Sequence, residues 1–412
     1  MHSDRRILSN TVLLSGSEAL GQLANLLFVA ALARAFGSEM LGHYSLGMAV
    51  GAVASLFVGL GTQSILIRDL SRNAPLMADR LGVLIPVQCI LAVVAWLAAT
   101  TVGTLLSSGI TAVGIIMSVC AYQILWRSSG LLYVPFRAAE SMHIPAAAEL
   151  GHRLFILAFG LAMLLLGATP GATLIVLPVS ALGLAAFGWW RMSLRFGRPA
   201  LRFAPAEAFV LFRSASPFFD VLLLGVLYTR GGIVMLGALR DEVEVGLYAV
   251  ADRALIAPLL LPNMLNAAVY PALSRLQHTA PDQAARLARR SMVLMLAGSV
   301  PLAALLYAFA PQLIRLLFGD EYLVAVPALQ LLAWTVPIRG IALLLGSQLA
   351  AMNRQKEMAR ARLIGLVSFG VLSYLLIAHQ GFTGLAVAVL SCEILQAILY
   401  AALIRSRSRV NP

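Results

Sequence analysis

Charged side chains are scarce in this sequence. Only 12% of its 412 residues are Asp, Glu, Lys or Arg, whereas soluble globular domains contain about a quarter. Hydrophobic residues make up 60% of the chain, and the mean hydropathy is +0.88. This composition excludes an ordinary soluble domain and indicates an integral membrane protein.

Cysteines and the common catalytic motifs are scarce as well. The three cysteines, Cys89, Cys120 and Cys392, all fall inside long apolar runs, with no CxxC pair and no His at ligand spacing. They are typical of apolar filler residues, so the sequence predicts neither a disulfide framework nor a metal site, and it implies no cofactor. No HExxH, GxSxG, P-loop or paired-carboxylate motif stands out, which weighs against an enzyme.

Basic residues are present, but they are unevenly placed. Of the 30 Lys and Arg residues, 24 lie in seven short clusters that recur at every second gap between apolar runs. Cytoplasmic loops of membrane proteins collect cations in this way, so we expect these loops and both termini to be cytoplasmic. The same one-sided clustering accounts for the net charge of +12 without a nucleic-acid partner. The clusters span residues 5–6, 68–80, 127–153, 191–213, 275–290, 354–362 and 405–409.

The alternation of clusters and gaps also predicts the number of membrane crossings. Seven inside clusters separated by six outside gaps require twelve crossings, and 412 residues suffice for twelve spans of roughly 20 residues. The sequence therefore predicts an all-α membrane protein with twelve transmembrane helices. The first apolar run is long enough to span and no A-x-A-like cleavage site follows it, so we expect a retained helix rather than a signal peptide. The predicted spans are 9–33, 41–67, 81–106, 110–134, 146–168, 172–193, 216–239, 246–272, 292–317, 324–350, 360–379 and 383–404.

An internal repeat divides the chain near its middle. The motif Gly-x-Tyr starts at Gly42 and again at Gly246, an offset of 204, and a Ser-Arg pair ends at Arg72 and at Arg275, an offset of 203. Because six spans are an even number, two six-helix halves would share one orientation in the membrane and would enclose the substrate path between them. The predicted halves are residues 1–200 and 201–412.

Polar residues recur on one face of the first predicted span. Thr11, Ser15, Glu18, Gln22 and Asn25 follow one another at steps of four, three, four and three, which places them on one side of a helix. An ionised carboxylate facing lipid is costly, so this face must contact protein or water. Two interpretations stay open: a polar seam against a neighbouring helix, or the wall of a solvated lumen, which five polar positions favour.

The seventh predicted span carries Arg230 near mid-depth, followed by Gly231 and Gly232. Adjacent glycines weaken a helix by roughly 1 kcal/mol each, so we expect a local break or bend there. Asp220 lies on the same span, but a continuous helix would hold it about 15 Å away, too far to neutralise the arginine. Arg230 therefore requires a partner on another helix or an anionic substrate.

The later spans carry further charged and polar residues. In the eighth span Pro258 and Pro262 predict a kink, and Arg253 points away from the polar face. Arg339 and Glu393 are predicted to be buried in the tenth and twelfth spans. Each charge alone fits a structural ion pair, but four acids and three arginines together favour a charged pathway. The polar face of the eighth span contains Tyr248, Asp252, Asn263, Asn266 and Tyr270.

Several short motifs, spread over essentially the whole chain, resemble one known family. It is the family of polysaccharide or O-antigen flippases, in the multidrug, oligosaccharidyl-lipid and polysaccharide exporter superfamily. The chain departs from it at Gly232, two residues after Arg230, where the family often has an Asp; ion coupling would then fall to Asp220 or Asp252. The motifs lie at residues 33–37, 42–44, 68–72, 246–248, 271–275, 317–322 and 329–334.

The resemblance implies a transport function. The substrate would be an undecaprenyl-pyrophosphate-linked oligosaccharide, an O-antigen or exopolysaccharide repeat unit, flipped across the bacterial inner membrane by alternating access. The implied partners are this lipid-linked oligosaccharide, membrane lipids, a polysaccharide polymerase and a chain-length regulator. Arginine suits a pyrophosphate because its charge is permanent and its donors form a fixed fork. The expected substrate contacts are Arg230, Arg253, Arg339, Gln22, Asn25, Tyr248, Asn263 and Asn266. The expected proton- or cation-coupling residues are Glu18, Asp220, Asp252 and Glu393.

Two other interpretations stay open. A drug exporter or a peptidoglycan-lipid flippase of the same superfamily would share the fold, although drug exporters usually favour cationic substrates and the peptidoglycan-lipid flippases often carry two additional helices. A membrane glycosyltransferase, polymerase or ligase acting on lipid-linked sugars would need a sizeable extracytoplasmic loop with acids or His. Every outside gap in this sequence is short, which favours a transporter over such an enzyme.

Overall fold

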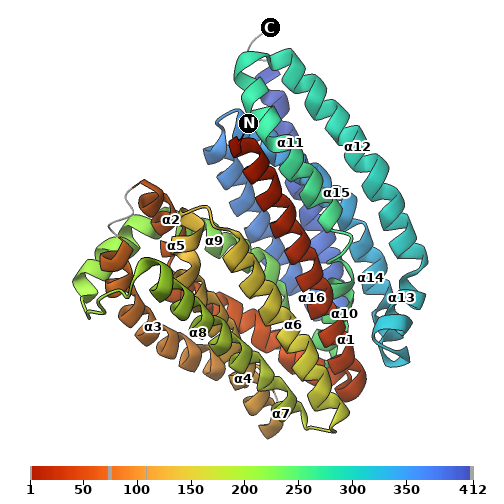
Figure 1. Cartoon of the computed structure of the whole chain (residues 1–412). Helices are drawn as coiled ribbons and strands as arrows, with labels where there is room; N and C mark the ends of the chain where they lie inside the picture. Colours follow the sequence, from red (N-terminus) through yellow and green to blue (C-terminus); the bar gives the residue numbers. More distant parts are fainter. Residues whose placement is uncertain (1, 73–76, 108, 409–412) are drawn as a thin grey trace. The chain divides into compact units, whose positions relative to one another are not determined.

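The computed structural model describes the backbone of residues 2–72, 77–107 and 109–408, and the side chains of residues 16–72, 77–107, 109 and 111–406. The described chain is helical and contains no strand (Figure 1). Nine helical segments in these ranges are long and apolar enough to cross a bilayer. The prediction of an all-α membrane protein is therefore confirmed, while the count of twelve crossings and the side of the termini stay predictions.

The longest helices at the two ends of the chain each contain a sharp turn. Helix α1 covers His2–Gly59 and α16 covers Gln355–Ser408. Inside them Gly37 (φ 79°) and Gly381 (φ 60°) leave the helical conformation, in a backbone region that favours glycine. These turns fall between the first and second predicted spans and between the eleventh and twelfth.

The chain divides into two compact units after Gly237. Helix α9 (Pro205–Leu239) therefore belongs for most of its length to the first unit. The predicted boundary at residue 200 follows from the sequence repeat, not from packing, and it stays a prediction.

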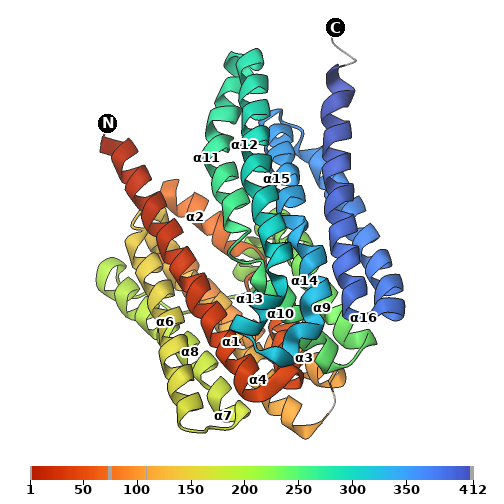
Figure 2. The same ribbon diagram turned by 90° about the vertical axis from the view of Figure 1, so that its right-hand side faces the viewer.

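The first unit is built around α1, which packs on α3, α4 and α6 (Figure 2). Close approach of α1 to α4 depends on small residues: a Cβ at Gly47 would lie 3.2 Å from the Val119 side chain, and one at Gly51 would lie 3.0 Å from Gln123. A core that includes Leu66, Leu84, Phe136, Leu184 and Leu211 joins the surrounding helices. The remaining elements are α2 (Thr62–Arg72), α3 (Met77–Leu105), α4 (Ile110–Ser129), the 3₁₀ turn η2 (Gly130–Tyr133), α5 (Val134–Ala138), α6 (His143–Leu165), α7 (Pro170–Leu174) and α8 (Val176–Phe196).

The second unit packs α11 and α12 against α15, and α15 against α16. Its elements before α16 are α10 (Glu242–Ala254), α11 (Leu260–Thr279), α12 (Pro281–Ala308), α13 (Ala310–Leu317), the 3₁₀ segment η3 (Asp320–Ala325), α14 (Val326–Ala333) and α15 (Thr335–Ala351).

The expected distortion of the eighth span is confirmed and is a full break. Helix α10 ends at Ala254 and α11 begins at Leu260, with Pro258 in the turns between them. Proline has no N–H to donate, and the break is bridged by short bonds such as Ile256 N to Arg253 O, 3.1 Å.

The expected break beside Arg230 is wrong. Helix α9 runs without interruption through Gly231 and Gly232. Gly232, Ile233 and Leu236 are buried, and packing of this segment offsets the weak helix propensity of two glycines.

A charged clamp holds the turn at Gly381. The carbonyls of Ile377 and Ala378 accept from Arg240 Nε (3.1 Å) and Nη2 (2.7 Å), and Glu244 Oε2 accepts from the backbone N–H of Phe382 (2.7 Å). Two side chains from the start of the second unit thus satisfy the peptide groups that the turn leaves unpaired.

Cysteine labelling checks the predicted sidedness. In a background with Cys89, Cys120 and Cys392 replaced by Ala, we expect Thr169→Cys to react with a membrane-impermeant maleimide in intact cells. Gln283→Cys should react only after the cells are permeabilised, because it lies in a basic loop. Both side chains are exposed, so accessibility differs only by membrane side. Equal labelling of the two in intact cells would contradict the topology.

Substitution of the α16 glycine tests the clamp. Gly381→Ala should lower the free energy of unfolding by about 1–3 kcal/mol, because its φ is positive and a Cβ there would collide with the Glu244 carboxylate. Gly370→Ala is the matched control, since it lies in the same helix with nothing within 4 Å, and it should be neutral or stabilising. Melting temperatures in detergent measure both, and an equal effect would show that the turn is not clamped.

Candidate functional site

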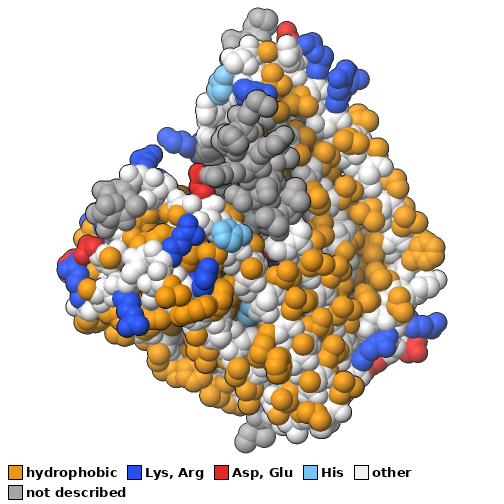
Figure 3. Space-filling model, in the orientation of Figure 1, with side chains coloured by type: hydrophobic (Ala, Val, Ile, Leu, Met, Phe, Trp, Pro, Cys, Tyr) orange, Lys and Arg blue, Asp and Glu red, His pale blue; other side chains and the backbone are white. Residues whose placement is uncertain are grey.

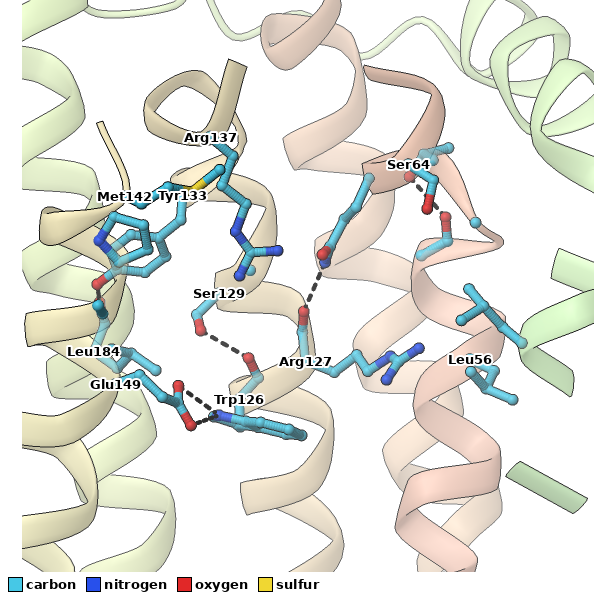
Figure 4. A pocket seen from close by; sticks show the side chains of 18 of the residues that line it. Leu56, Ser64, Trp126, Arg127, Ser129, Tyr133, Arg137, Met142, Glu149 and Leu184 are labelled. Atoms are coloured by element: carbon cyan, nitrogen blue, oxygen red, sulfur yellow. Dashed lines mark hydrogen bonds between the residues drawn. The ribbon is translucent and has the colours of Figure 1, made fainter. Parts of the chain in front are cut away.

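The first unit encloses a cavity of about 610 Å³ where several helices end (Figure 4). Helix α1 stops at Gly59, and Leu60 and Gly61 both have positive φ before α2 begins. Helix α4 passes into the η2 turn on another side of the cavity. Breaks of this kind expose peptide groups, which only protein or water can satisfy within a membrane protein.

Polar side chains form hydrogen bonds with some of these exposed peptide groups. Thr62 Oγ1 donates to the carbonyl of Gly59 at 2.7 Å, and it accepts from Gln88 Nε2 at 3.1 Å. Gln63 Nε2 donates to the carbonyl of Arg127 at 3.0 Å and so joins α2 to the end of α4. The broken helix thereby forms a fixed polar wall of the cavity.

Five charged side chains line the cavity, and three of them neutralise one another. Arg153 Nη1 lies 3.3 Å from Glu18 Oε1, and Arg153 Nε lies 3.0 Å from Glu149 Oε1. Glu149 also accepts from Trp126 Nε1, with distances of 3.2 and 3.1 Å to its two oxygens. Arg153 thus joins α6 to α1 through Glu18, and Glu149 joins α6 to α4 through Trp126.

Gly21 lets Arg153 reach Glu18. A Cβ at position 21 would lie 2.6 Å from Cδ and 2.9 Å from Nη1 of Arg153, so a side chain there would displace the arginine. Gly21 is itself buried in α1, one turn after Glu18.

The other two cavity arginines, Arg127 and Arg137, form no ion pair with a described residue, although Glu149 acts electrostatically on Arg137 from farther away. Neither guanidinium has an ion pair or a hydrogen bond with any side chain or carbonyl that the structure describes, although both residues are partly buried. Figure 4 shows the Arg137 side chain reaching down toward Ser129, while that of Arg127 points toward Leu56. Three arginines against two glutamates leave the cavity cationic, which suits an anionic ligand.

Of the polar face predicted on the first span, Glu18 lines the cavity, and the side chains of Thr11 and Ser15 lie outside the described residues. Gln22 Nε2 donates to Glu18 Oε1 at 2.8 Å, so it orients this carboxylate from outside the lining. Asn25 is partly buried farther along α1. The face therefore acts partly as a polar seam and partly as a cavity wall.

The two charged residues predicted on α9, Asp220 and Arg230, are not among the residues that line this cavity. Asp220 is exposed, and Arg230 is partly buried without a hydrogen bond or ion pair to any described residue of the first unit. Leu222 is the α9 residue that lines the cavity. The predicted roles of Asp220 and Arg230 stay predictions.

In the second unit, Arg339 and Glu393 form an ion pair with Nε and Oε1 3.3 Å apart. The Glu393 side chain is only 6% exposed and that of Arg339 is 34% exposed. The sequence analysis gave them separate roles, as substrate contact and coupling residue, yet in the structure each neutralises the other.

The predicted face of the eighth span is split by the break between α10 and α11. Tyr248, buried, and Asp252 and Arg253, partly buried, lie on α10. On α11, Asn263 is exposed and Asn266 accepts from Ser347 Oγ at 2.7 Å. These residues therefore do not share one continuous helix.

The sequence analysis missed Arg127, Arg137, Glu149 and Arg153 as site residues. It attributed the three arginines to the cytoplasmic basic cluster at 127–153. One signal was available: Glu149 and Arg153 are four residues apart, a spacing that favours an ion pair on a helix. The position of Arg137 depends on the η2 turn and gave no such signal.

Comparison with known proteins identifies the family. A family model described as "Polysaccharide biosynthesis protein" matches residues 7–277, about two thirds of the chain. The chain belongs to this family. A second model, MatE, matches residues 221–377.

A curated relative comes from Haloferax volcanii and is named "Probable low-salt glycan biosynthesis flippase Agl15". It is 23% identical over 198 residues, which is 46% of this chain and 42% of the relative. The match thus spans less than half the length of that protein.

Two solved structures show the same fold. The lipid II flippase MurJ in an inward closed conformation has a TM-score of 0.78 at 14% identity, covering 96% of this chain and 87% of that one. An inward-facing multidrug resistance MATE transporter of the MOP superfamily has a TM-score of 0.71 at 14% identity, with 94% of both chains covered. The predicted family resemblance is therefore confirmed by the two family models, and the two solved structures share the fold.

Proposed function

We propose that this protein is a flippase that moves a lipid-linked oligosaccharide across the membrane, and that Arg127 and Arg137 bind the pyrophosphate of the substrate. Membership of the polysaccharide biosynthesis family and the fold shared with MurJ and MATE transporters support a transporter rather than an enzyme. The uncompensated cationic charge of the cavity is the observation that favours an anionic substrate.

Charge balance is the physical reason for this assignment. Two partly buried guanidinium groups that form no ion pair with a described residue are unfavourable until an anion enters, whereas Arg153 already pairs with both Glu18 and Glu149. A pyrophosphate offers several acceptor oxygens to two guanidinium forks at once. The same argument disfavours a cationic drug as substrate.

The dimensions of the cavity limit what it holds. Ligand pockets commonly measure about 300–1,000 Å³, and this cavity of about 610 Å³ lies within that range. We infer that it takes the pyrophosphate and adjacent sugar, while the lipid chain and distal sugars extend beyond it.

The finer identity of the substrate belongs to the same proposal. An undecaprenyl-pyrophosphate carrier, an O-antigen or exopolysaccharide repeat unit and a location in the bacterial inner membrane follow from the family resemblance. A polymerase and a chain-length regulator would then be partners. Alternating access between the two units would move the substrate.

The acidic candidates keep a proposed role in ion coupling. Glu18 and Glu393 each hold an arginine in the structure, so protonation of Glu393 would free Arg339 from this ion pair, and protonation of Glu18 would leave Arg153 with Glu149 alone. Asp220 and Asp252 remain candidates by their predicted depth. Arg230, Arg253 and Arg339, with Gln22, Asn25, Tyr248, Asn263 and Asn266, remain candidates for later positions of the substrate.

A reconstituted flipping assay tests the assignment. We expect Arg127→Gln and Arg137→Gln each to slow translocation of a fluorescent polyprenyl-pyrophosphate oligosaccharide in vesicles by about 10-fold or more, because each removes a charge-assisted contact worth roughly 1.5–3 kcal/mol. Arg213→Gln, on the exposed surface of α9, is the matched control.

Two further measurements distinguish the role of the cavity from the flippase activity itself. Protein in detergent should bind inorganic pyrophosphate, and the same two variants should lose this binding. Normal flipping by both variants would refute the role of the cavity, and a wild-type protein that elongates or transfers the sugar without translocating it would refute the flippase. If only Arg230→Gln, Arg253→Gln or Arg339→Gln slow flipping, the substrate path lies at those residues instead.

A further inference from the structure

Helix α12 has two contrasting faces over its whole length. Small and apolar residues face the second unit and are buried: Ala284, Ala288, Ser291, Met295, Ser299 and Ala303. The opposite face is exposed and changes character along the helix. Its first part carries Arg286, Arg289 and Arg290, and its later part carries Val293, Leu294, Val300 and Leu305.

The cationic and apolar parts are continuous on one side of the helix. Arg286, Arg289 and Arg290 are three and four residues apart, and Val293 and Leu294 follow with the same spacing. From Val293 to Leu305 the apolar stripe runs for about 18 Å, more than half the thickness of the hydrocarbon core. Figure 3 shows basic side chains gathered where α12 begins and hydrophobic ones along the rest of that edge.

These arginines are not neutralised by the protein. None of the three has an ion pair or a hydrogen bond from its side chain among the residues that the structure describes, and all three are exposed. Between residues 271 and 300, Asp282 is the one acid against four arginines. Two other surface arginines are paired with acids: Arg202 contacts Asp79 and Glu207, and Arg315 contacts Asp320.

The spacing also matches a phosphate group. Side chains three and four apart on a helix have Cβ atoms about 5–6 Å apart, so three guanidinium forks can converge on one phosphodiester. Guanidinium groups bind phosphate oxygens through paired donors, which a diffuse surface charge does not provide.

We propose that this face of α12 is a binding site for an anionic phospholipid. The phosphate of the headgroup lies among Arg286, Arg289 and Arg290, and the acyl chains lie along Val293, Leu294 and Val300. Arg275, exposed near the end of α11, adds a fourth cation beside the turn. This site is separate from the cavity of the first unit and does not depend on the substrate of the protein.

Simple attraction between a basic loop and an anionic membrane gives a different expectation. It depends on the number of charges, whereas a site depends on their arrangement. Arg72, Arg198 and Arg213 provide the comparison, because they are also exposed, belong to predicted cytoplasmic clusters and lack the spacing of three or four residues found on α12.

Native mass spectrometry of the purified full chain in a neutral detergent tests the site with phosphatidylglycerol and, as the zwitterionic control, phosphatidylcholine. The wild type should retain phosphatidylglycerol in preference to phosphatidylcholine. The triple variant Arg286→Gln, Arg289→Gln and Arg290→Gln should bind it at least about 10-fold more weakly, through loss of the converging forks.

The matched triple variant Arg72→Gln, Arg198→Gln and Arg213→Gln removes the same charge and should bind phosphatidylglycerol within about twofold of the wild type, since its arginines are not one helical turn apart. Equal losses in the two triple variants, or no loss in the α12 variant, would overturn the site.

A third variant keeps the test valid if the α12 glutamine variant does not fold, as judged by its melting temperature without lipid. Arg286→Lys, Arg289→Lys and Arg290→Lys preserve the charge but remove the guanidinium forks. We expect this variant to retain phosphatidylglycerol at least about threefold more weakly than the wild type. Unchanged retention would refute the proposed phosphate geometry.

Discussion

A lipid bilayer offers no hydrogen bond to a peptide group, and this constraint determines both the helices of the protein and the places where they stop. Regular helices satisfy their own backbone. Where a helix is interrupted, side chains must do so instead. At Gly381 the partners are Arg240 and Glu244, at the α1–α2 break Thr62 binds the carbonyl of Gly59, and Gln63 binds the carbonyl of Arg127 at the end of α4. The second of these breaks also opens a cavity, so the same constraint produces the candidate site.

Charge compensation distinguishes the arginines of the molecule from one another. Arg153 is held by two carboxylates and Arg339 by one, so both contribute to the connections between helices. Arg127 and Arg137 line a cavity without such partners, and the arginines of α12 face outward without them. Arginines of the first kind stabilise helix packing at a desolvation cost, whereas the second kind retain their attraction for an external anion.

The sequence predicted those features of the fold that local chemistry controls. Apolar composition and one-sided clusters of arginine indicated a helical membrane protein. Pro258 predicted the distortion of the eighth span, because proline lacks a backbone N–H in any surroundings. Gly231 and Gly232 led to a wrong prediction of a helix break, because packing of α9 outweighed their unfavourable helix propensity of about 1 kcal/mol each. The cavity was not predictable from spacing, since Glu18 lies more than 100 residues before Arg127 and Arg153. An arginine near a cytoplasmic span end also looks the same in sequence whether it sets topology or lines a site.

The absence of a side chain at Gly21 has a consequence for the charge of the cavity. Because Arg153 crosses α1 over this glycine, its contact with Glu18 depends on the volume of a residue that is itself uncharged, while Glu149 pairs with it on its own helix. Any larger residue at position 21 would separate Arg153 from Glu18 and alter the electrostatic potential of the cavity without changing a single ionisable group. The size of the residue at position 21 therefore decides whether Glu18 and Arg153 can meet across the two helices.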